Sequence, residues 1–385
     1  MAKKARVELT CTAAHAAAFR LARHHLGSSG PRTKNREPGT VAGICRATGG
    51  IQAQVMSAAE MALWTRRRET TRDEIWAALF DRREIVKTSA MRLTLHLIPA
   101  ADLPMVVAAL RPMSMASLER WHTRVGAKQD DVKALVDSIM DGLSDGPRTQ
   151  QELIARARKK AGKGMRAWLD NSWGALRPAV IDGLIVYGPP RGPATTFVRV
   201  DQWLPRQPAV GVDEARAELL RRFLSAFGPA SAHDFAKWSG LKTSDAKVVM
   251  AALRDEIVQV SVDGAPGWIR RADQKALTNG DLDPSAIRLL GPFDSFLLAH
   301  ATKAHLVEPK HYKRVYRPQG WISPVVLRGG AIVGVWFPTK KGQRVTLGVE
   351  LFDRVTTALR QGVEREAEAM GRFLGVGCVA RFSSG

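Results

Sequence analysis

Two glutamines, Gln52 and Gln54, stand two residues apart just before a predicted helix. Ser57 and Glu60 form a capping-box pattern, which predicts that this helix begins at about residue 58. We expect the segment 51–55 to be extended, so that residues two apart share one face of the chain. Both side chains would then point the same way beside the positive end of the helix. Each amide offers an acceptor oxygen and an NH₂ donor, which could hold a water molecule.

A structural role is the alternative for this pair, because polar residues before a helix are most often solvated or bonded to the backbone. The two amides alone leave open whether the stretch is a catalytic site or an ordinary connection into a helix. The charge of the chain and the elements around the pair narrow the choice.

The chain is strongly basic, with 58 Lys and Arg against 37 Asp and Glu and a formal net charge of +21. This surplus favours a polyanionic partner, because each phosphate that the protein neutralises releases counterions. Nucleic acid is the leading candidate. A membrane surface would also attract the charge, but no apolar run approaches the roughly 20 residues of a spanning helix. We therefore expect no membrane association.

The cysteines and the N-terminus indicate the compartment. The basic residues near the N-terminus are not followed by an apolar segment, so we expect no secretory signal. Cys11, Cys45 and Cys378 are isolated and odd in number, which excludes both a disulfide framework and a zinc-ribbon spacing. We expect a cytoplasmic protein, associated with the nucleoid through DNA, that holds no metal and needs no cofactor.

A capping pattern followed by helices and a hairpin occurs twice. The stretch 146–153 (GPRTQQEL) matches 228–235 (GPASAHDF). Each copy continues as helix, break and second helix, and then as two β-prone runs around a turn, at 184–200 and 257–271. Helices followed by such a hairpin form a winged helix-turn-helix. An earlier unit fits the same order less regularly, with predicted helices near 12–26, 57–67 and 72–80 and a β-prone stretch at 93–99.

The C-terminal part differs in character. After residue 281, three strand-like runs are broken at glycine turns and followed by a predicted helix from 352 to about 373. We therefore predict an α+β fold, with three tandem winged helix-turn-helix modules and a C-terminal β-meander or barrel-like module. The predicted domains are module 1 with the glutamine pair (1–130), module 2 (131–205), module 3 (206–280) and the C-terminal β-rich module with its terminal helix (281–385).

Two stretches are rich in cations. The stretch 155–166 (ARARKKAGKGMR) has no acidic residue, and 311–320 (HYKRVYRPQG) has cations interleaved with aromatic residues. A solvated face is the usual role of such a run, but the net charge and the winged helices favour a surface that follows phosphates. Arg191 and Arg328 lie at predicted turns that could enter a groove or could be ordinary exposed turns. The candidate DNA-binding residues are Arg156, Arg158, Lys159, Lys160, Lys163, Arg166, Arg191, Lys313, Arg314, Arg317 and Arg328.

Five stretches, in order along the chain, together resemble the AlkZ-like DNA glycosylases. They are 50–54 (GIQAQ), 91–104 (MRLTLHLIPAADLP), 226–241 (AFGPASAHDFAKWSGL), 289–300 (LLGPFDSFLLAH) and 315–327 (VYRPQGWISPVVL). The resemblance implies a repair enzyme that acts on double-stranded DNA, removes N7-alkylated purines and unhooks interstrand crosslinks, as in antibiotic self-resistance. It also implies that Gln52 and Gln54 are the catalytic Gln-x-Gln motif, and that a hairpin probes the minor groove.

The chemistry of such a lesion explains why two amides could suffice. Cleavage of a glycosidic bond passes through a cation-like sugar, and ordinarily an acid must protonate the leaving group. An N7-alkylguanine already carries positive charge and leaves as a neutral base. The amide oxygens then need only hold a water and stabilise the sugar cation. No Lys is plainly placed for Schiff-base chemistry, so we expect a monofunctional glycosylase without lyase activity.

His96 and Asp294 each have two interpretations. His96 could contact the lesion or a phosphate, or it could be bonded within its own module. For Asp294 we favour a structural role, as the buried partner of an arginine or as a helix cap. Two other functions stay open: a DNA-binding regulator without enzymatic activity, and a glycosylase for small N7-alkyl monoadducts only. In each case we expect a monomer.

Overall fold

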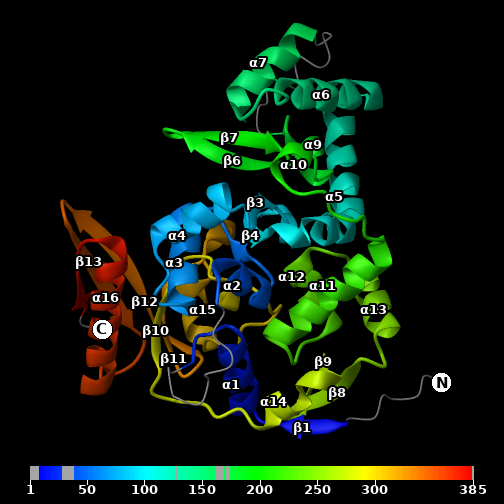
Figure 1. The fold of residues 1–385 in the computed structure, drawn as a ribbon. Coiled ribbons are helices and arrows are strands. Elements are labelled where there is room, and N and C mark those ends of the chain that lie inside the picture. Colours follow the sequence, from blue (N-terminus) through cyan, green and yellow to red (C-terminus); the bar gives the residue numbers. More distant parts are fainter. Residues whose placement is uncertain (1–7, 28–38, 127, 161–168, 170–173, 384–385) are drawn as a thin grey trace. The chain divides into compact units, whose positions relative to one another are not determined.

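The structure, a computed structural model, describes residues 8–27, 39–126, 128–160, 169 and 174–383 (Figure 1). The chain forms two compact units. The first unit is built from Met1–Ile75, Leu220–Trp238 and Lys242–Gly385, and the second from Trp76–Leu219 and Ser239–Leu241. Helical modules with hairpins and a C-terminal sheet confirm the predicted α+β class. The predicted boundaries between four domains stay predictions. None of the described helices has both the length and the apolarity to cross a bilayer.

The third winged-helix module has a reciprocal cap where its second helix begins. Ser231 Oγ accepts the Asp234 N–H at 3.1 Å, and the Asp234 carboxylate accepts the Ser231 N–H at 2.8 Å. An N-terminal strand extends the hairpin of this module as the parallel partner of β8. The elements are α11 (Val212–Phe227), α12 (Ala232–Ser239), α13 (Thr243–Ala252), β8 (Ile257–Val262), β9 (Ala265–Arg270) and α14 (Gln274–Thr278), joined by β1 (Leu9–Cys11) and α1 (Ala13–Arg23).

The second module repeats the same cap. Thr149 Oγ1 accepts the Glu152 N–H at 3.2 Å, and Glu152 Oε2 accepts the Thr149 N–H at 2.7 Å. Since this cap matches Ser231 and Asp234, the repeated capping pattern is confirmed, while residues 161–168 and 170–173 of this copy lie outside the described part of the chain. The module contains α6 (Gln129–Gly142), β5 (Arg148–Thr149), α7 (Gln150–Lys160), α9 (Arg177–Ile181), β6 (Ile185–Arg191) and β7 (Ala194–Arg199). In the sequence it follows α5 (Leu103–Val125) and precedes α10 (Val200–Trp203).

The first module contains the glutamines, and its predicted capping box is wrong. Helix α3 begins at Met56, so that Ser57 lies inside the helix and no side chain caps it. Glu60 is buried and accepts a bond from Arg72 Nε at 2.9 Å, which offsets the desolvation of the carboxylate. The elements are α2 (Val41–Ala47), β2 (Ile51–Gln52), α3 (Met56–Arg66), α4 (Arg72–Trp76) with a π-helical turn (Ala77–Asp81), β3 (Ile85–Ser89) and β4 (Leu95–Pro99).

The C-terminal part is a five-stranded sheet in the order β10-β11-β12-β13-β14, antiparallel as far as β13. Helix α16 lies along this sheet (Figure 1) and returns the chain, so that β14 runs parallel to β13. The three predicted runs correspond to β11, β12 and β13. The prediction missed β10 and β14, and it started the helix too early. The elements are β10 (Ile287–Leu290), α15 (Tyr312–Val315), β11 (Val325–Arg328), β12 (Ala331–Lys341), β13 (Arg344–Leu351), α16 (Thr357–Leu374) and β14 (Gly377–Phe382).

Candidate active site

The glutamine segment follows a tight turn in the first compact unit. After α2 the chain turns through Gly49 and Gly50, whose φ angles are 67° and 105°. The Gly50 N–H donates to the Cys45 carbonyl at 2.7 Å, which closes the helix end. A Cβ on Gly49 would lie 2.8 Å from the Trp238 ring, so close packing as well as the positive φ requires glycine there. The turn leads directly into β2.

The two glutamines differ in exposure. Gln52 is 8% exposed, and its neighbours Ile51 and Ala53 are 1% and 0% exposed. Gln54 is exposed, and the chain bends there before α3 begins at Met56. Because only Ile51–Gln52 forms a regular strand, the idea that both side chains share one face stays a prediction. The positive end of the α3 dipole lies beside Gln54 in the chain, as expected.

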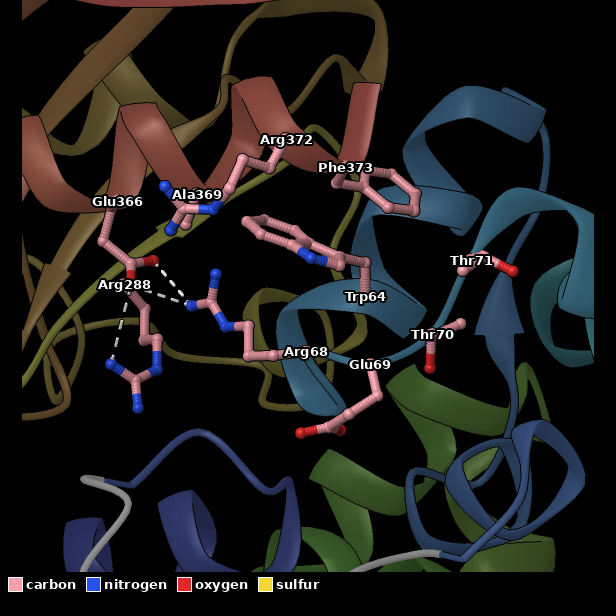
Figure 2. Close-up of a pocket in the computed structure, with 10 residues that line it drawn as sticks. All are labelled: Trp64, Arg68, Glu69, Thr70, Thr71, Arg288, Glu366, Ala369, Arg372 and Phe373. Atoms are coloured by element: carbon pink, nitrogen blue, oxygen red, sulfur yellow. Dashed lines mark hydrogen bonds and ion pairs between the residues drawn. The ribbon is translucent and has the colours of Figure 1, made fainter. Parts of the chain in front are cut away.

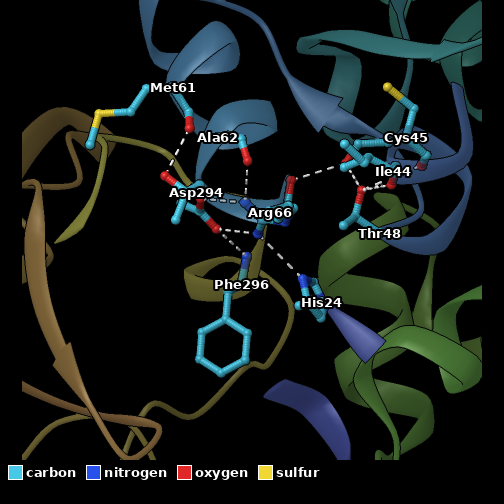
Figure 3. A network of polar contacts seen from close by, with 12 residues as sticks. His24, Ile44, Cys45, Thr48, Met61, Ala62, Arg66, Asp294 and Phe296 are labelled. Atoms are coloured by element: carbon cyan, nitrogen blue, oxygen red, sulfur yellow. Dashed lines mark hydrogen bonds and ion pairs between the residues drawn. The ribbon is translucent and has the colours of Figure 1, made fainter. Parts of the chain in front are cut away.

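A buried ion pair connects α3 to the loop after β10 (Figure 3). Arg66 Nη2 and Nη1 donate to the two Asp294 oxygens at 2.7 Å and 2.8 Å, and both side chains are fully buried. Arg66 also donates to the Ala62 carbonyl at 2.9 Å. The Asp294 carboxylate accepts the Phe296 N–H at 2.9 Å. Asp294 is therefore both an arginine partner and a cap, the two structural roles that the sequence favoured.

Ser295 extends this network to the glutamine segment. Its side chain is buried, and its Oγ donates to the Gly50 carbonyl at 2.9 Å. Thr48 Oγ1 lies 3.5 Å from the same carbonyl but donates more closely to Ile44, at 2.9 Å. The carbonyl that precedes Ile51 therefore receives its shortest side-chain bond from Ser295.

His24 contacts the same arginine (Figure 3). Its Nδ1 lies 3.4 Å from Arg66 Nη2, and its ring packs against Phe227 and Phe296 with centroids 4.7 Å and 5.3 Å away. Burial, reinforced by the Arg66 charge, holds the pKa of His24 well below its usual value. The imidazole is therefore neutral at physiological pH and can accept a hydrogen bond from Arg66.

A separate cavity of about 440 Å³ lies between the end of α3 and α16 (Figure 2). Arg68 Nη2 lies 2.8 Å from both Glu366 oxygens, and Arg288 Nη1 lies 3.8 Å from one of them. The Arg68 guanidinium also lies 4.2 Å from the Trp64 ring centroid, a cation–π geometry. Glu366 already supplies a carboxylate to both arginines. Neither glutamine lines the cavity, so it is distinct from the candidate active site.

His96 lies on β4 in the second compact unit. It is 2% exposed, and its Nδ1 lies 2.9 Å from the Thr94 carbonyl, which can only accept a hydrogen bond. Burial, reinforced by the Arg92 charge, lowers the pKa of His96 to about 3. A buried neutral ring favours the role within its own module. The contact to a lesion or a phosphate stays a prediction.

The predicted DNA-binding residues lie on several elements. Arg156, Arg158 and Lys159 are exposed on α7. The side chain of Lys160, and the whole of Lys163 and Arg166, lie outside the described part of the chain.

The remaining candidates lie at the ends of β6 and β11, on α15 and just after α15, and three of them already have partners. Arg191 and Arg314 form exposed ion pairs with glutamates at 2.8 Å and 2.9 Å. Arg328 Nε donates to a backbone carbonyl at 3.2 Å, and Lys313 and Arg317 are exposed. Exposed ion pairs contribute little stability, so such arginines can exchange a carboxylate for a phosphate.

One cationic turn was not among the candidates. Strands β12 and β13 form a hairpin in which Lys341 pairs with Arg344, and both residues are exposed together with Lys340. The sequence around Lys341 and Gly342 indicated a turn, but its three cations were not connected to DNA binding.

Comparisons with known proteins match nearly the whole chain. A family model described as "DNA glycosylase AlkZ-like" matches residues 45–373. An "Interstrand DNA cross-link repair glycosylase" of Streptomyces sahachiroi is 31% identical over 373 residues, which cover 93% of this chain and 95% of the relative. The solved structure of the Streptomyces sahachiroi DNA glycosylase AlkZ is 26% identical with a TM-score of 0.82, and the match covers 97% of this chain and all of that chain.

Proposed function

Because the chain belongs to the AlkZ-like DNA glycosylase family, and is therefore a DNA glycosylase, we propose that it releases N7-alkylated purines and unhooks interstrand crosslinks. The Streptomyces relative, whose name states crosslink repair, supports this substrate class because it matches over nearly its full length. The observation that carries the proposal is the pair Gln52 and Gln54, uncharged amides just ahead of α3 in a strongly basic protein.

In the proposed reaction, the amide oxygens of Gln52 and Gln54 accept hydrogen bonds from one water molecule. The glycosidic bond of the cationic purine breaks, the bonding electrons stay with the purine nitrogen, and the base leaves neutral. The water oxygen then bonds to the anomeric carbon and loses a proton to solvent. The negative ends of the amide dipoles stabilise the sugar while it carries positive charge. Amides suffice because the lesion itself supplies the charge that an acid would otherwise provide.

The exposed cations supply the duplex-binding surface in this proposal. Those on α7, at the Arg191 and Arg328 turns and on the segment around Lys313 would neutralise phosphates, and Lys340 and Lys341 join them. None of these contacts would read bases, since phosphate contacts position a protein on DNA without specifying sequence. We further propose that the protein acts as a monomer in the cytoplasm without metal or cofactor, and that His96 supports its own module.

An excision panel tests the function. The protein is incubated with one duplex carrying a single N7-methylguanine and with a second duplex carrying an N7–N7 crosslink. We expect release of the base from both, abasic sites that alkali cleaves, and no covalent complex after borohydride treatment, because no lysine takes part. Excision from the first duplex alone would restrict the protein to monoadducts. Tight DNA binding without excision from either would favour the regulator.

A further inference from the structure

We infer that Ser295 is a positioning residue for the glutamine pair, acting through the backbone of the segment that carries it. The inference rests on the proposed function, because it assigns a role relative to the catalytic glutamines. Its structural basis is separate: a two-residue stretch, Asp294 and Ser295, is bonded to the chain on both sides of Gln52 and Gln54.

The bond on the N-terminal side restrains a segment that the local backbone leaves adaptable. Gly50 has a φ of 105°, a region where glycine has unusual freedom. Its carbonyl lies at the junction with Ile51, one residue before Gln52, and receives the Ser295 hydroxyl at 2.9 Å. Loss of this bond would leave a buried carbonyl that Thr48 reaches only at 3.5 Å. The direction of β2 would then be less restricted.

The bond on the C-terminal side holds the helix that follows the pair. Arg66 is the last residue of α3, which begins two residues after Gln54. Its two bonds to Asp294 fix the loop that carries Ser295 relative to that helix. Asp294 also caps the 3₁₀ turn Ser295–Leu297 through the Phe296 N–H, which sets the direction of the Ser295 backbone.

The contacts of Asp294 and Ser295 would hold Gln52 and Gln54 in the positions needed to bind a water molecule before the substrate arrives. Two amides can hold one water only if their oxygens stay at fixed positions, and a displacement of about 1 Å can cost a factor of about 100 in rate. Substrate binding draws on many cations, so it should not depend on this clamp. A positioning role therefore predicts a loss in the chemical step with unchanged affinity for DNA.

Ser323 provides a matched control. Its side chain is 0% exposed, and its Oγ donates to the Arg314 carbonyl at 2.9 Å, the same bond type and length. It lies in the same compact unit as Ser295. Replacing either serine by alanine removes one buried hydroxyl and takes from one backbone carbonyl its closest side-chain donor, so both changes should lower the melting temperature.

The experiment compares S295A with S323A in single-turnover excision of N7-methylguanine, DNA affinity and amide hydrogen exchange. We expect S295A to lower the rate constant by about 10- to 100-fold at unchanged Kd, and to speed exchange in the peptide 49–56. S323A should retain the wild-type rate and exchange in that peptide. Equal rates and equal exchange for the two variants would overturn the inference. If Gln52→Ala is inactive while S295A keeps the wild-type rate, the positioning role fails and the proposed function stands.

Discussion

Two arginines near the end of α3 bind carboxylates in different surroundings. Arg66 and Asp294 are both 0% exposed, whereas Arg68 and Glu366 are 30% and 13% exposed at the edge of a cavity. Water can replace a partner at the second pair but not at the first. Breaking a buried pair leaves an unpaired charge in the interior, while an accessible pair contributes little. The buried pair is therefore suited to fixing the glutamine segment, and the accessible pair only joins the turn after α3 to α16.

The sharpest test of this contrast is Asp294→Ala. The change leaves the buried Arg66 guanidinium without its carboxylate and should lower the free energy of unfolding by about 3 to 5 kcal/mol. Urea denaturation measures the loss. A loss below about 1 kcal/mol would show that the pair is solvated in solution and would remove the distinction from Arg68.

Acid provides a second way to separate the two regions. His24 belongs to the buried network, its pKa is depressed, and no histidine lines the cavity beside Arg68. Below about pH 6.5 the imidazole binds a proton in the unfolded chain but stays neutral in the folded protein. The contribution of His24 to the free energy of unfolding is therefore fully present above this pH and is lost progressively below it. The pKa of His96 is lowered to about 3, so His96 adds to this loss of unfolding free energy as the pH falls from about 6.5 to about 3.

The pH dependence can be assigned with one variant and one control. Each such histidine should contribute about 1.4 kcal/mol per pH unit to the slope of unfolding free energy below pH 6.5. His24→Gln should reduce the slope by about that amount, while His233→Gln, which alters an exposed side chain, should not. A wild-type stability that stays constant between pH 7 and pH 4 would contradict a neutral buried His24.

The smallest effect is expected at the accessible pair. Arg68→Ala removes one partner of Glu366, but the Glu366 carboxylate still accepts the Leu289 N–H at 3.2 Å and lies 3.8 Å from Arg288 Nη1. We expect a loss of about 1 kcal/mol or less and unchanged excision. Thermal unfolding and single-turnover rates check this. If Arg68→Ala costs as much as Asp294→Ala, burial does not explain the contrast.

Short sequence patterns correctly predicted those elements whose hydrogen bonds join residues close in the sequence. The caps at Thr149 and Ser231 formed as expected because both partners lie within one turn of the chain. The capping box predicted at Ser57 was wrong, because Glu60 accepts a bond from Arg72 instead of capping the start of α3. Strand β1 pairs with β8, so that Leu9 lies opposite Val260 from a distant part of the sequence, and no short-range pattern could indicate that pairing.

The candidate active site shows the same difference between residues that the sequence indicates and contacts that only the fold creates. The glutamines stood out through their spacing and the family resemblance, and the residues around Asp294 suggested a buried arginine partner. That the partner is Arg66, with His24 beside it, depends on three distant parts of the chain meeting in one core. Ser295 gave no signal, because a serine next to an aspartate is common and only its distance to the Gly50 carbonyl reveals the contact.

The central claim is that Gln52 and Gln54 carry the chemistry, and single-turnover excision by Gln52→Ala and Gln54→Ala proteins tests it most directly. Each change should lower the rate by about 10²- to 10³-fold, the scale of losing one preorganised polar group, at unchanged DNA affinity and in proteins that stay folded at the assay temperature. The double variant should be little worse than the poorer single one, because the two residues act as a unit. Wild-type rates in single variants that are folded under the assay conditions would contradict the account and reduce the segment to a connection between α2 and α3.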